Sequence, residues 1–495
     1  MPSPNTLARN SDGVIYPDPP RFLSRLSPRH LIRYLGPGVI IASVTIGNGE
    51  LVWASRSGAI FGYTLLWCFL YAGTFKAIQV YSAARHITLT GEHPLATWAR
   101  LPGPPMWFPL LIVLPAVMLM PVAFSALPET LGGFVHRTIG LALEGADVGP
   151  WEHFEWWENV WGTAVLALCT SLAVRSSYAL VERVSAIVLG TLMLCVGVSV
   201  IVYQPALGEL IRGLFVPGTP TYPNWVLAAP YAEEFGGRTP WLEISVYLTA
   251  VGGGAYDYIG YIGMLREKQW GVAVGPPISK EELTSAVTGQ DAKENCRRAR
   301  VWCRAPLLDA TLSFFFVILV TLLFAILGTV VLHSAEVIPR NTDLLTQQER
   351  FLHPNLAWLY RVAVLLAFLG TLYGAFAVYR HTFLESLSVI APRWRQRWTE
   401  KRWGHVIFCY CVVGGLTMVW LPKVIAGDIV GRITFGSLLS GATSCGLWCF
   451  VMLWTNHVRL PKELRMGRIG WLLVLASGVG MTLLGLQTII AYFTS

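Results

Sequence analysis

The chain has 495 residues, of which 54% are hydrophobic and 13% are charged. Soluble globular proteins carry roughly 25% charged residues, so this composition excludes a soluble globular protein. Apolar runs of about 20 residues, the length that crosses a bilayer as a helix, recur along the whole chain. They predict one polytopic α-helical membrane domain.

Residues 1–32 are polar and rich in proline, without the short apolar stretch and small-residue cleavage site of a signal peptide. We therefore expect a cytoplasmic N-terminal tail, followed by a single transmembrane domain at 33–493. The apolar runs predict eleven membrane helices, at 33–57, 60–84, 106–132, 159–175, 179–203, 241–265, 306–332, 356–385, 403–422, 429–454 and 469–493. An odd number of spans places the two termini on opposite sides of the membrane.

The basic residues determine the predicted orientation. With the N-terminus in the cytoplasm, the inner segments contain 27 of the 37 lysines and arginines, and the outer loops contain six. Membrane proteins keep their basic residues inside, so we expect a cytoplasmic N-terminus and an outside C-terminus, in a bacterial inner (cell) membrane. The net charge of +8 then belongs to this inner face, and we expect no nucleic-acid partner.

The first apolar run is interrupted by Gly47-Asn48-Gly49-Glu50. A continuous membrane helix would not carry two glycines, an asparagine and a glutamate at its centre. A helix that unwinds there can expose backbone carbonyls and one acid to a buried solute. This segment therefore indicates a transporter.

The sixth run has a matching interruption, with three glycines at 252–254 followed by Asp257. If the chain contains two halves of five helices, at about 33–203 and 241–454, the two interruptions occupy the first helix of each half, and the eleventh helix at 469–493 stands apart. Interrupted helices at corresponding positions are typical of the substrate site of a transporter with inverted repeats.

Several motifs resemble one family. Gly36-Pro37-Gly38 opens the first helix, residues 61–67 (FGYTLLW) open the second, and Ser82-Ala83-Ala84-Arg85 leads to Thr90-Gly91. These residues are similar to the Nramp (natural resistance-associated macrophage protein) family of divalent metal transporters, most strongly in the first two helices and more weakly up to the eighth. The resemblance implies an all-α polytopic protein with a LeuT-type fold, in which two inverted five-helix repeats are followed by an eleventh helix.

The site implied by this resemblance departs from the family pattern. The family's Asp-Pro-Gly-Asn falls on residues 47–50, so glycine replaces the aspartate at Gly47 and Glu50 replaces the asparagine. Its metal-binding methionine falls on Tyr258, beside Ala255 and Asp257. The implied ligands, Gly47, Glu50, Ala255, Asp257 and Tyr258, offer oxygen alone, which suits Mg²⁺, Ca²⁺ or Mn²⁺ better than soft transition metals.

Each acid also has a structural alternative. A carboxylate within a membrane costs about 2.5–3.5 kcal/mol or more and is functional by default, but Glu50 could pair with Arg56 or Lys76 to hold the first two helices together. Asp257 could cap the broken half-helix. Glu129 in the third helix and His381 in the eighth are candidates for a proton or access pathway. The alternative for each is a position at the membrane interface without a role in transport.

We therefore expect a secondary-active transporter that moves a divalent cation by alternating access around the two broken helices. The sequence leaves proton coupling and the oligomeric state open. The alternative is a cation-coupled symporter of a small organic solute, such as an amino acid or amine, and a cation sensor is a third possibility. We expect no enzymatic activity and no resident cofactor, with the metal ion as substrate and the lipid bilayer as surroundings.

Overall fold

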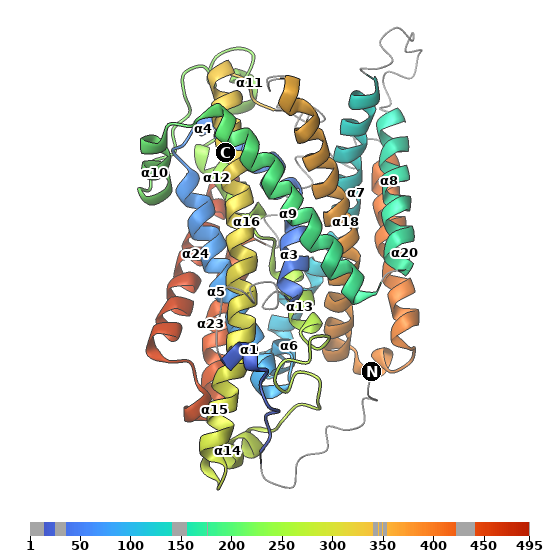
Figure 1. Cartoon of the computed structure of the whole chain (residues 1–495), viewed down its shortest axis with the longest axis vertical. Coiled ribbons are helices and arrows are strands. Elements are labelled where there is room, and N and C mark those ends of the chain that lie inside the picture. The colour runs from blue at the N-terminus through green and yellow to red at the C-terminus, as the bar shows by residue number, and fades with distance from the viewer. Residues whose placement is uncertain are drawn as a thin grey trace.

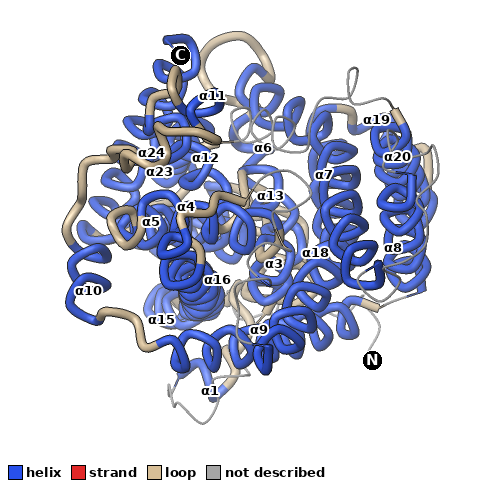
Figure 2. The backbone as a smooth tube through the Cα atoms, turned by 90° about the horizontal axis from the view of Figure 1, so that it is seen from above, coloured by secondary structure: helices blue, strands red, loops and turns tan. Residues whose placement is uncertain are grey.

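A computed structural model describes residues 14–24, 36–140, 156–175, 177–339, 345, 349, 354–421 and 441–494. Within these residues all regular structure is helical (Figure 2). The all-α expectation is therefore confirmed.

A helix or a broken pair of helices lies at each of the eleven predicted spans, within the described ranges (Figure 1). They are α3 (Pro37–Thr45) with α4 (Ala54–Phe61), α5 (Leu66–Thr90), α7 (Trp107–Gly140), α8 (Trp156–Arg175), α9 (Tyr178–Tyr203), α12 (Pro240–Ala250) with α13 (Ala255–Met264), α16 (Arg304–Val331), α18 (Pro354–Ile390), α20 (Glu400–Trp420), α23 (Ala442–Arg459) and α24 (Arg468–Thr494). The shorter helices are α1 (Arg21–Ser24), α6 (Pro94–Trp98), α10 (Leu207–Phe215), α11 (Ala232–Phe235), α14 (Lys280–Thr288), α15 (Ala292–Trp302) and α19 (Pro392–Arg395). The predicted beginning of the tenth span, at 429–440, lies outside the described residues.

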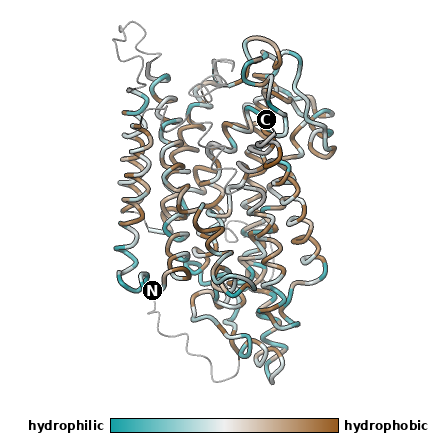
Figure 3. The backbone as a smooth tube through the Cα atoms, turned by 180° about the vertical axis from the view of Figure 1, so that it is seen from behind, coloured by the Kyte–Doolittle hydropathy of each residue, from teal (hydrophilic) through white to brown (hydrophobic). Residues whose placement is uncertain are grey.

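By length and hydropathy, six of the described helices are able to cross a membrane, or seven if α3 and residues 49–61, which are bent by 50°, count as one span. The outward face of α9 is strongly apolar: Ile187, Leu194 and Ile201, spaced seven residues apart, are 68%, 67% and 74% exposed. Hydrophobic residues fill the middle of the bundle and hydrophilic ones gather at its two ends (Figure 3). The protein is an integral membrane protein.

The broken helices occupy the middle of the bundle. Seen from above, α3 and α13 lie near its centre (Figure 2), and α3 packs against α9, α16 and α18. Small residues allow the close contacts this requires. A side chain at Gly58 of α4 would meet the carbonyl oxygen of Ala325 of α16, and one at Gly328 would meet the carbonyl of Ser55.

The beginning of α3 is held by a carboxylate from α16. Asp309 accepts hydrogen bonds from the backbone N–H groups of Gly36 (2.6 Å) and Gly38 (2.9 Å). A Cβ atom at Gly38 would lie 2.8 Å from Asp309 Oδ1, so the glycine permits this approach. A negative charge at a helix N-terminus is favourable, and it fixes the position of the half-helix that carries the first break.

The described N-terminal segment and the last helix lie toward opposite ends of the bundle (Figure 1). Residues 14–24 lie against α15, where Trp302 Nε1 donates to the carbonyl of Pro17 (2.8 Å) and Arg298 donates to the carbonyl of Tyr16 (3.1 Å). The last helix, α24, ends near the other end of the bundle. Termini on opposite sides of the membrane stay a prediction.

Candidate functional site

The first span is unwound where the sequence predicts it. Regular α-helix ends at Thr45, a π-helix runs from Asn48 to Trp53, and α4 follows. Thr371 of α18 donates its hydroxyl toward the carbonyls released by this break, those of Ser43 (3.0 Å) and Ile46 (2.9 Å). A Cβ at Gly47 would lie 3.1 Å from the Thr371 side chain, so the glycine lets α18 approach the break.

The sixth span is interrupted between Ala250 and Ala255. Gly252 and Gly253 have φ values of +73° and +76°, in the left-handed region that side chains disfavour. A Cβ at Gly253 would lie 2.6 Å from Thr45 Cγ2 at the end of α3. The two breaks therefore lie side by side, and the glycines make this contact possible.

Glu50 joins the two breaks directly. Its Oε1 accepts a hydrogen bond from the backbone N–H of Gly252 at 2.9 Å. Its other oxygen, Oε2, is buried and has no hydrogen-bond partner among the described residues. Buried polar atoms are rarely left unpartnered, so Glu50 presents an acceptor to the space between the two half-helices.

Asp257 has a similar arrangement within the second break. Its Oδ2 accepts from the backbone N–H of Gly254 at 2.9 Å, so the carboxylate does cap α13. Its Oδ1 is also buried and is bonded to none of the described groups. Ala255 begins the helix and is buried. Capping thus uses one oxygen of Asp257 and leaves the second available.

Tyr258 faces back onto the interrupted backbone. Its hydroxyl donates toward the carbonyls of Gly252 (2.7 Å) and Gly253 (3.3 Å). Its ring lies against Phe314 and Trp448, with ring centroids 6.1 and 6.4 Å away. The phenol therefore satisfies carbonyls of the break.

A lysine lies at the same break. Lys76 of α5 donates from Nζ to the carbonyls of Val251 (2.5 Å) and Gly253 (2.8 Å), and it lies within electrostatic range of Glu50 and Asp257. The side chains of Glu50, Lys76 and Asp257 are 0%, 1% and 2% exposed. From the sequence Lys76 is a possible partner of Glu50; in the structure its ammonium binds these carbonyls.

Two further polar residues lie near the site and are not among the site residues expected from the sequence. Gln79 is completely buried on α5, its amide oxygen has no partner in the described chain, and its side chain lies within hydrogen-bonding range of Cys445. Cys445 of α23 lies within electrostatic range of Lys76 and Asp257. The spacing of Lys76 and Gln79, three residues apart in an apolar helix and hence on one face, was the available signal.

Arg56 does not pair with Glu50. It binds Glu234 at 2.7 Å and Glu243 at 3.3 Å, and it donates to the carbonyl of Pro339 at 2.8 Å. These contacts tie α4 to α12 and to the segment around α11. The proposed Glu50–Arg56 pair is therefore not formed, and Arg56 belongs to a separate buried network.

Glu129 lies on α7 and His381 on α18, outside the two broken spans. Glu129 is buried in α7. His381 of α18 has its Nε2 4.0 Å from Glu267 Oε1, near the end of the bundle predicted to be cytoplasmic. Burial raises the pKa of the Glu267 carboxyl above its usual value, which favours its retention of a proton at that end. A role of Glu129 or His381 in a proton or access pathway stays a prediction.

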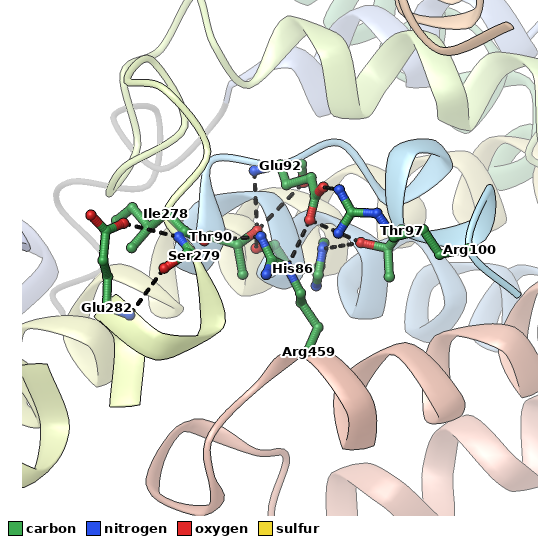
Figure 4. A network of polar contacts seen from close by, with 9 residues as sticks. All are labelled: His86, Thr90, Glu92, Thr97, Arg100, Ile278, Ser279, Glu282 and Arg459. Atoms are coloured by element: carbon green, nitrogen blue, oxygen red, sulfur yellow. Dashed lines mark hydrogen bonds and ion pairs between the residues drawn. The ribbon is translucent and has the colours of Figure 1, made fainter. Parts of the chain in front are cut away.

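Networks of charged residues lie toward both ends of the bundle. Arg56 lies toward the end predicted to face outside. Toward the other end, Glu92 accepts from Arg459 (2.7 Å), Thr97 (3.1 Å) and Arg100 (3.2 Å), as Figure 4 shows. Arg459 also donates to the carbonyl of Ile278 at 2.9 Å. These bonds join the end of α5 to α6, α23 and the segment before α14.

The donors at the site fit a hard cation only in part. Two carboxylates each present an unpartnered oxygen, and carbonyls of two broken helices lie beside them. In the described residues, no three His, Cys, Asp or Glu side chains come together as a metal-binding group. Any cation bound here would therefore depend on backbone carbonyls as well as on the two acids.

The fold and the paired breaks are of the LeuT type. A manganese transporter from Eremococcus coleocola superposes with a TM-score of 0.65 at 15% identity, covering 97% of this chain and 90% of that one. MhsT in complex with L-phenylalanine gives 0.52 at 11% identity, over 92% of this chain and 98% of that one. At these identities the likeness concerns the fold alone.

The first half of the sequence resembles a known family. Residues 38–229 match the model described as natural resistance-associated macrophage protein-like. The metal transporter Nramp6 of Arabidopsis thaliana is 25% identical over 43% of this chain and 37% of its own length, and the divalent metal cation transporter MntH of Pectobacterium carotovorum is 29% identical over 42% and 46%. The matches span less than half of these relatives. Over this part of its length the chain is similar to the Nramp family, and these relatives are named as metal transporters.

Proposed function

We propose that this protein is a secondary-active transporter that moves a divalent cation by alternating access around its two broken helices. The observation that carries the proposal is the link between the breaks: Glu50 of the first span bonds to Gly252 of the sixth and keeps a second, unpartnered oxygen. Asp257 adds a second unpartnered oxygen at the same break. Ionised carboxylates with a spare oxygen are suitable ligands for hard cations.

The closed networks at both ends support alternating access. The three acidic and basic residues of the site are buried, so solvent reaches it only when one of the networks opens. Arg56 connects α4 with α12, which are the outer halves of the two broken spans in the predicted orientation. Glu92 connects elements at the inner end. Opening one network while the other stays closed would expose the site to one side at a time.

The selectivity follows from the donor atoms. Glu50, Asp257 and the carbonyls of the breaks supply oxygen, so Mg²⁺, Ca²⁺ or Mn²⁺ should bind at least as well as Cd²⁺. Cys445 carries a thiol sulfur within electrostatic range of Asp257. If Cd²⁺ is preferred, substitution of Cys445 tests whether this sulfur is the cause. The relatives are named as metal transporters, so an organic-solute symporter is not favoured.

The test is Mn²⁺ uptake into proteoliposomes that contain the purified protein, with competition by Mg²⁺, Ca²⁺ and Cd²⁺ and with a dye that reports internal pH. We expect saturable Mn²⁺ uptake that Glu50→Gln abolishes, because the amide keeps the size of the side chain and removes its charge. Glu209→Gln, a matched change at an exposed position on α10, should transport as the unchanged protein does. Uptake that survives Glu50→Gln at full rate would overturn the assignment.

A further inference from the structure

The Lys76 ammonium lies where a cation would be expected. An unwound transmembrane helix releases carbonyls that coordinate cations. Here the carbonyls of Val251 and Gly253 bind Nζ at 2.5 and 2.8 Å. The lysine comes from α5, far from the break in sequence, and its ammonium is completely enclosed. A positive charge of the protein itself thus occupies part of the coordination sphere.

The backbone of the break is shaped around this side chain. A Cβ at Gly252 would lie 3.7 Å from Lys76 Cδ and 2.9 Å from the ring of Phe314. Gly252 also has a positive φ. The glycine therefore leaves room for the lysine side chain beside the break, and two carbonyl contacts hold its ammonium there.

The charges at the site decide what can bind beside it. With Glu50 and Asp257 ionised and Lys76 protonated, the three side chains together carry one negative charge. A divalent cation added to this set would leave an excess positive charge in a buried site, which is unfavourable. Without the ammonium, the two carboxylates and a divalent cation together carry no net charge. The lysine therefore opposes divalent binding through charge as well as through occupancy.

We propose that Lys76 is a specificity-determining residue: its ammonium occupies the carbonyls of Val251 and Gly253 as a tethered competitor, and a divalent cation binds only when the ammonium leaves them. This inference rests on the proposed function. Gln79 provides a place for the displaced ammonium, because its buried amide oxygen has no partner within the described chain and side chains three residues apart on a helix are neighbours.

The competing explanation is that Lys76 only satisfies carbonyls that the break leaves unpaired. The two explanations predict different results for cation affinity. A lysine that serves only the backbone can be replaced by another donor without change in divalent binding. A tethered competitor weakens binding as long as it carries its charge, and removal of the charge strengthens binding.

The experiment is calorimetric titration of the purified full-length protein with Mn²⁺. We expect Lys76→Met and Lys76→Gln to bind Mn²⁺ at least tenfold more tightly than the unchanged protein, which corresponds to about 1.4 kcal/mol. Lys76→Arg, which keeps the charge, should gain no affinity. Lys293→Met, at an exposed position on α15, is the matched control and should leave the affinity unchanged.

A second measurement tests occupancy without relying on one variant. In Lys76→Ala, added ethylammonium should compete with Mn²⁺, because a free amine can enter the position of the missing ammonium, and it should not compete in the unchanged protein. Glutamine keeps a hydrogen-bond donor, so Lys76→Gln supplies a folded charge-free variant if methionine at this position prevents folding.

The outcomes separate this inference from the proposed function. If the unchanged protein binds Mn²⁺ and the folded charge-free variants bind it no more tightly, Lys76 is not a competitor and the inference is wrong. If the unchanged protein and all Lys76 variants bind none of Mn²⁺, Mg²⁺ and Ca²⁺, the proposed function itself fails.

Discussion

The buried network around Arg56 gives a quantitative prediction. Arg56 and Glu243 are 2% and 7% exposed as side chains and approach to 3.3 Å through two nitrogen–oxygen pairs. Glu243 also accepts from Tyr247 at 2.8 Å. Glu234 is more exposed, at 26%, so water can replace its partner. Glu243 is the group that loses most when Arg56 is changed.

Arg56→Gln leaves the Glu243 carboxylate buried with its cationic partner removed. Breaking a buried ion pair in this way costs about 3–5 kcal/mol, most of it for the uncompensated charge. The double variant Arg56→Gln/Glu243→Gln removes that charge as well. We therefore expect it to be more stable than Arg56→Gln alone, with a coupling energy of about 1–3 kcal/mol between the two positions.

The assay is unfolding of the purified protein in detergent, followed by tryptophan fluorescence, for the two single variants and the double variant. Mn²⁺ affinity should be retained in every variant that folds, since neither side chain forms the bonds that hold Glu50 or Asp257. Effects of the two substitutions that add to within about 0.5 kcal/mol would refute the reasoning, because independent sites behave in that way.

Three further predictions concern other parts of the molecule. Gly253→Ala should lower stability by at least about 1–2 kcal/mol and abolish Mn²⁺ uptake, because φ is +76° and a Cβ would clash with Thr45. The control Gly190→Ala, with nothing within 4 Å of its Cβ, should be neutral or slightly stabilising. Equal effects of the two substitutions in thermal unfolding would contradict this prediction. Arg459→Gln should loosen the network around Glu92 more than Arg100→Gln does, because the two arginine side chains are 13% and 65% exposed, respectively. Hydrogen exchange at residues 274–280 measures the difference. Faster exchange in Arg100→Gln than in Arg459→Gln would be inconsistent with the structure. Hydrogen bonds from Arg297 and Arg298 lower the pKa of Glu294 from 4.5 to about 2, so this pairing is present above pH 4.5 and is lost as the pH falls toward 2; exchange in α15, corrected for intrinsic rates, should not rise between pH 7 and 5, and a rise would contradict the assignment.

The pH dependence of cation binding follows from the ligands. A cation needs the ionised form of Glu50 and Asp257, so protons and cations compete and affinity should fall as the pH is lowered. Calorimetric titrations with Mn²⁺ at pH 8, 6 and 4.5 measure this. An affinity independent of pH over that range would show that the carboxylates are not the ligands.

The sequence by itself determined the class of protein and the positions of its interruptions. Apolar length reports directly whether a segment can cross a bilayer, because each span must satisfy its own backbone in lipid. Glycines and acids within an apolar run predict a break in the helix in the same direct way. Both predicted breaks lie at the expected residues, at 47–50 and 252–254. The Nramp resemblance, carried by motifs in the first two helices, is confirmed by the family match over residues 38–229.

Only the tertiary structure decided which groups meet at the breaks. Glu50 bonds to Gly252 across 202 residues, and Lys76 bonds to Val251 across 175. Arg56 pairs with Glu243 and not with Glu50. Local pattern shows which face of a helix a residue occupies, but not which helix lies opposite, because packing between distant segments depends on the fit of all their side chains. For this reason the sequence offered Lys76 only as one of two possible partners for Glu50. The structure shows that Lys76 is bound to carbonyls of the sixth span.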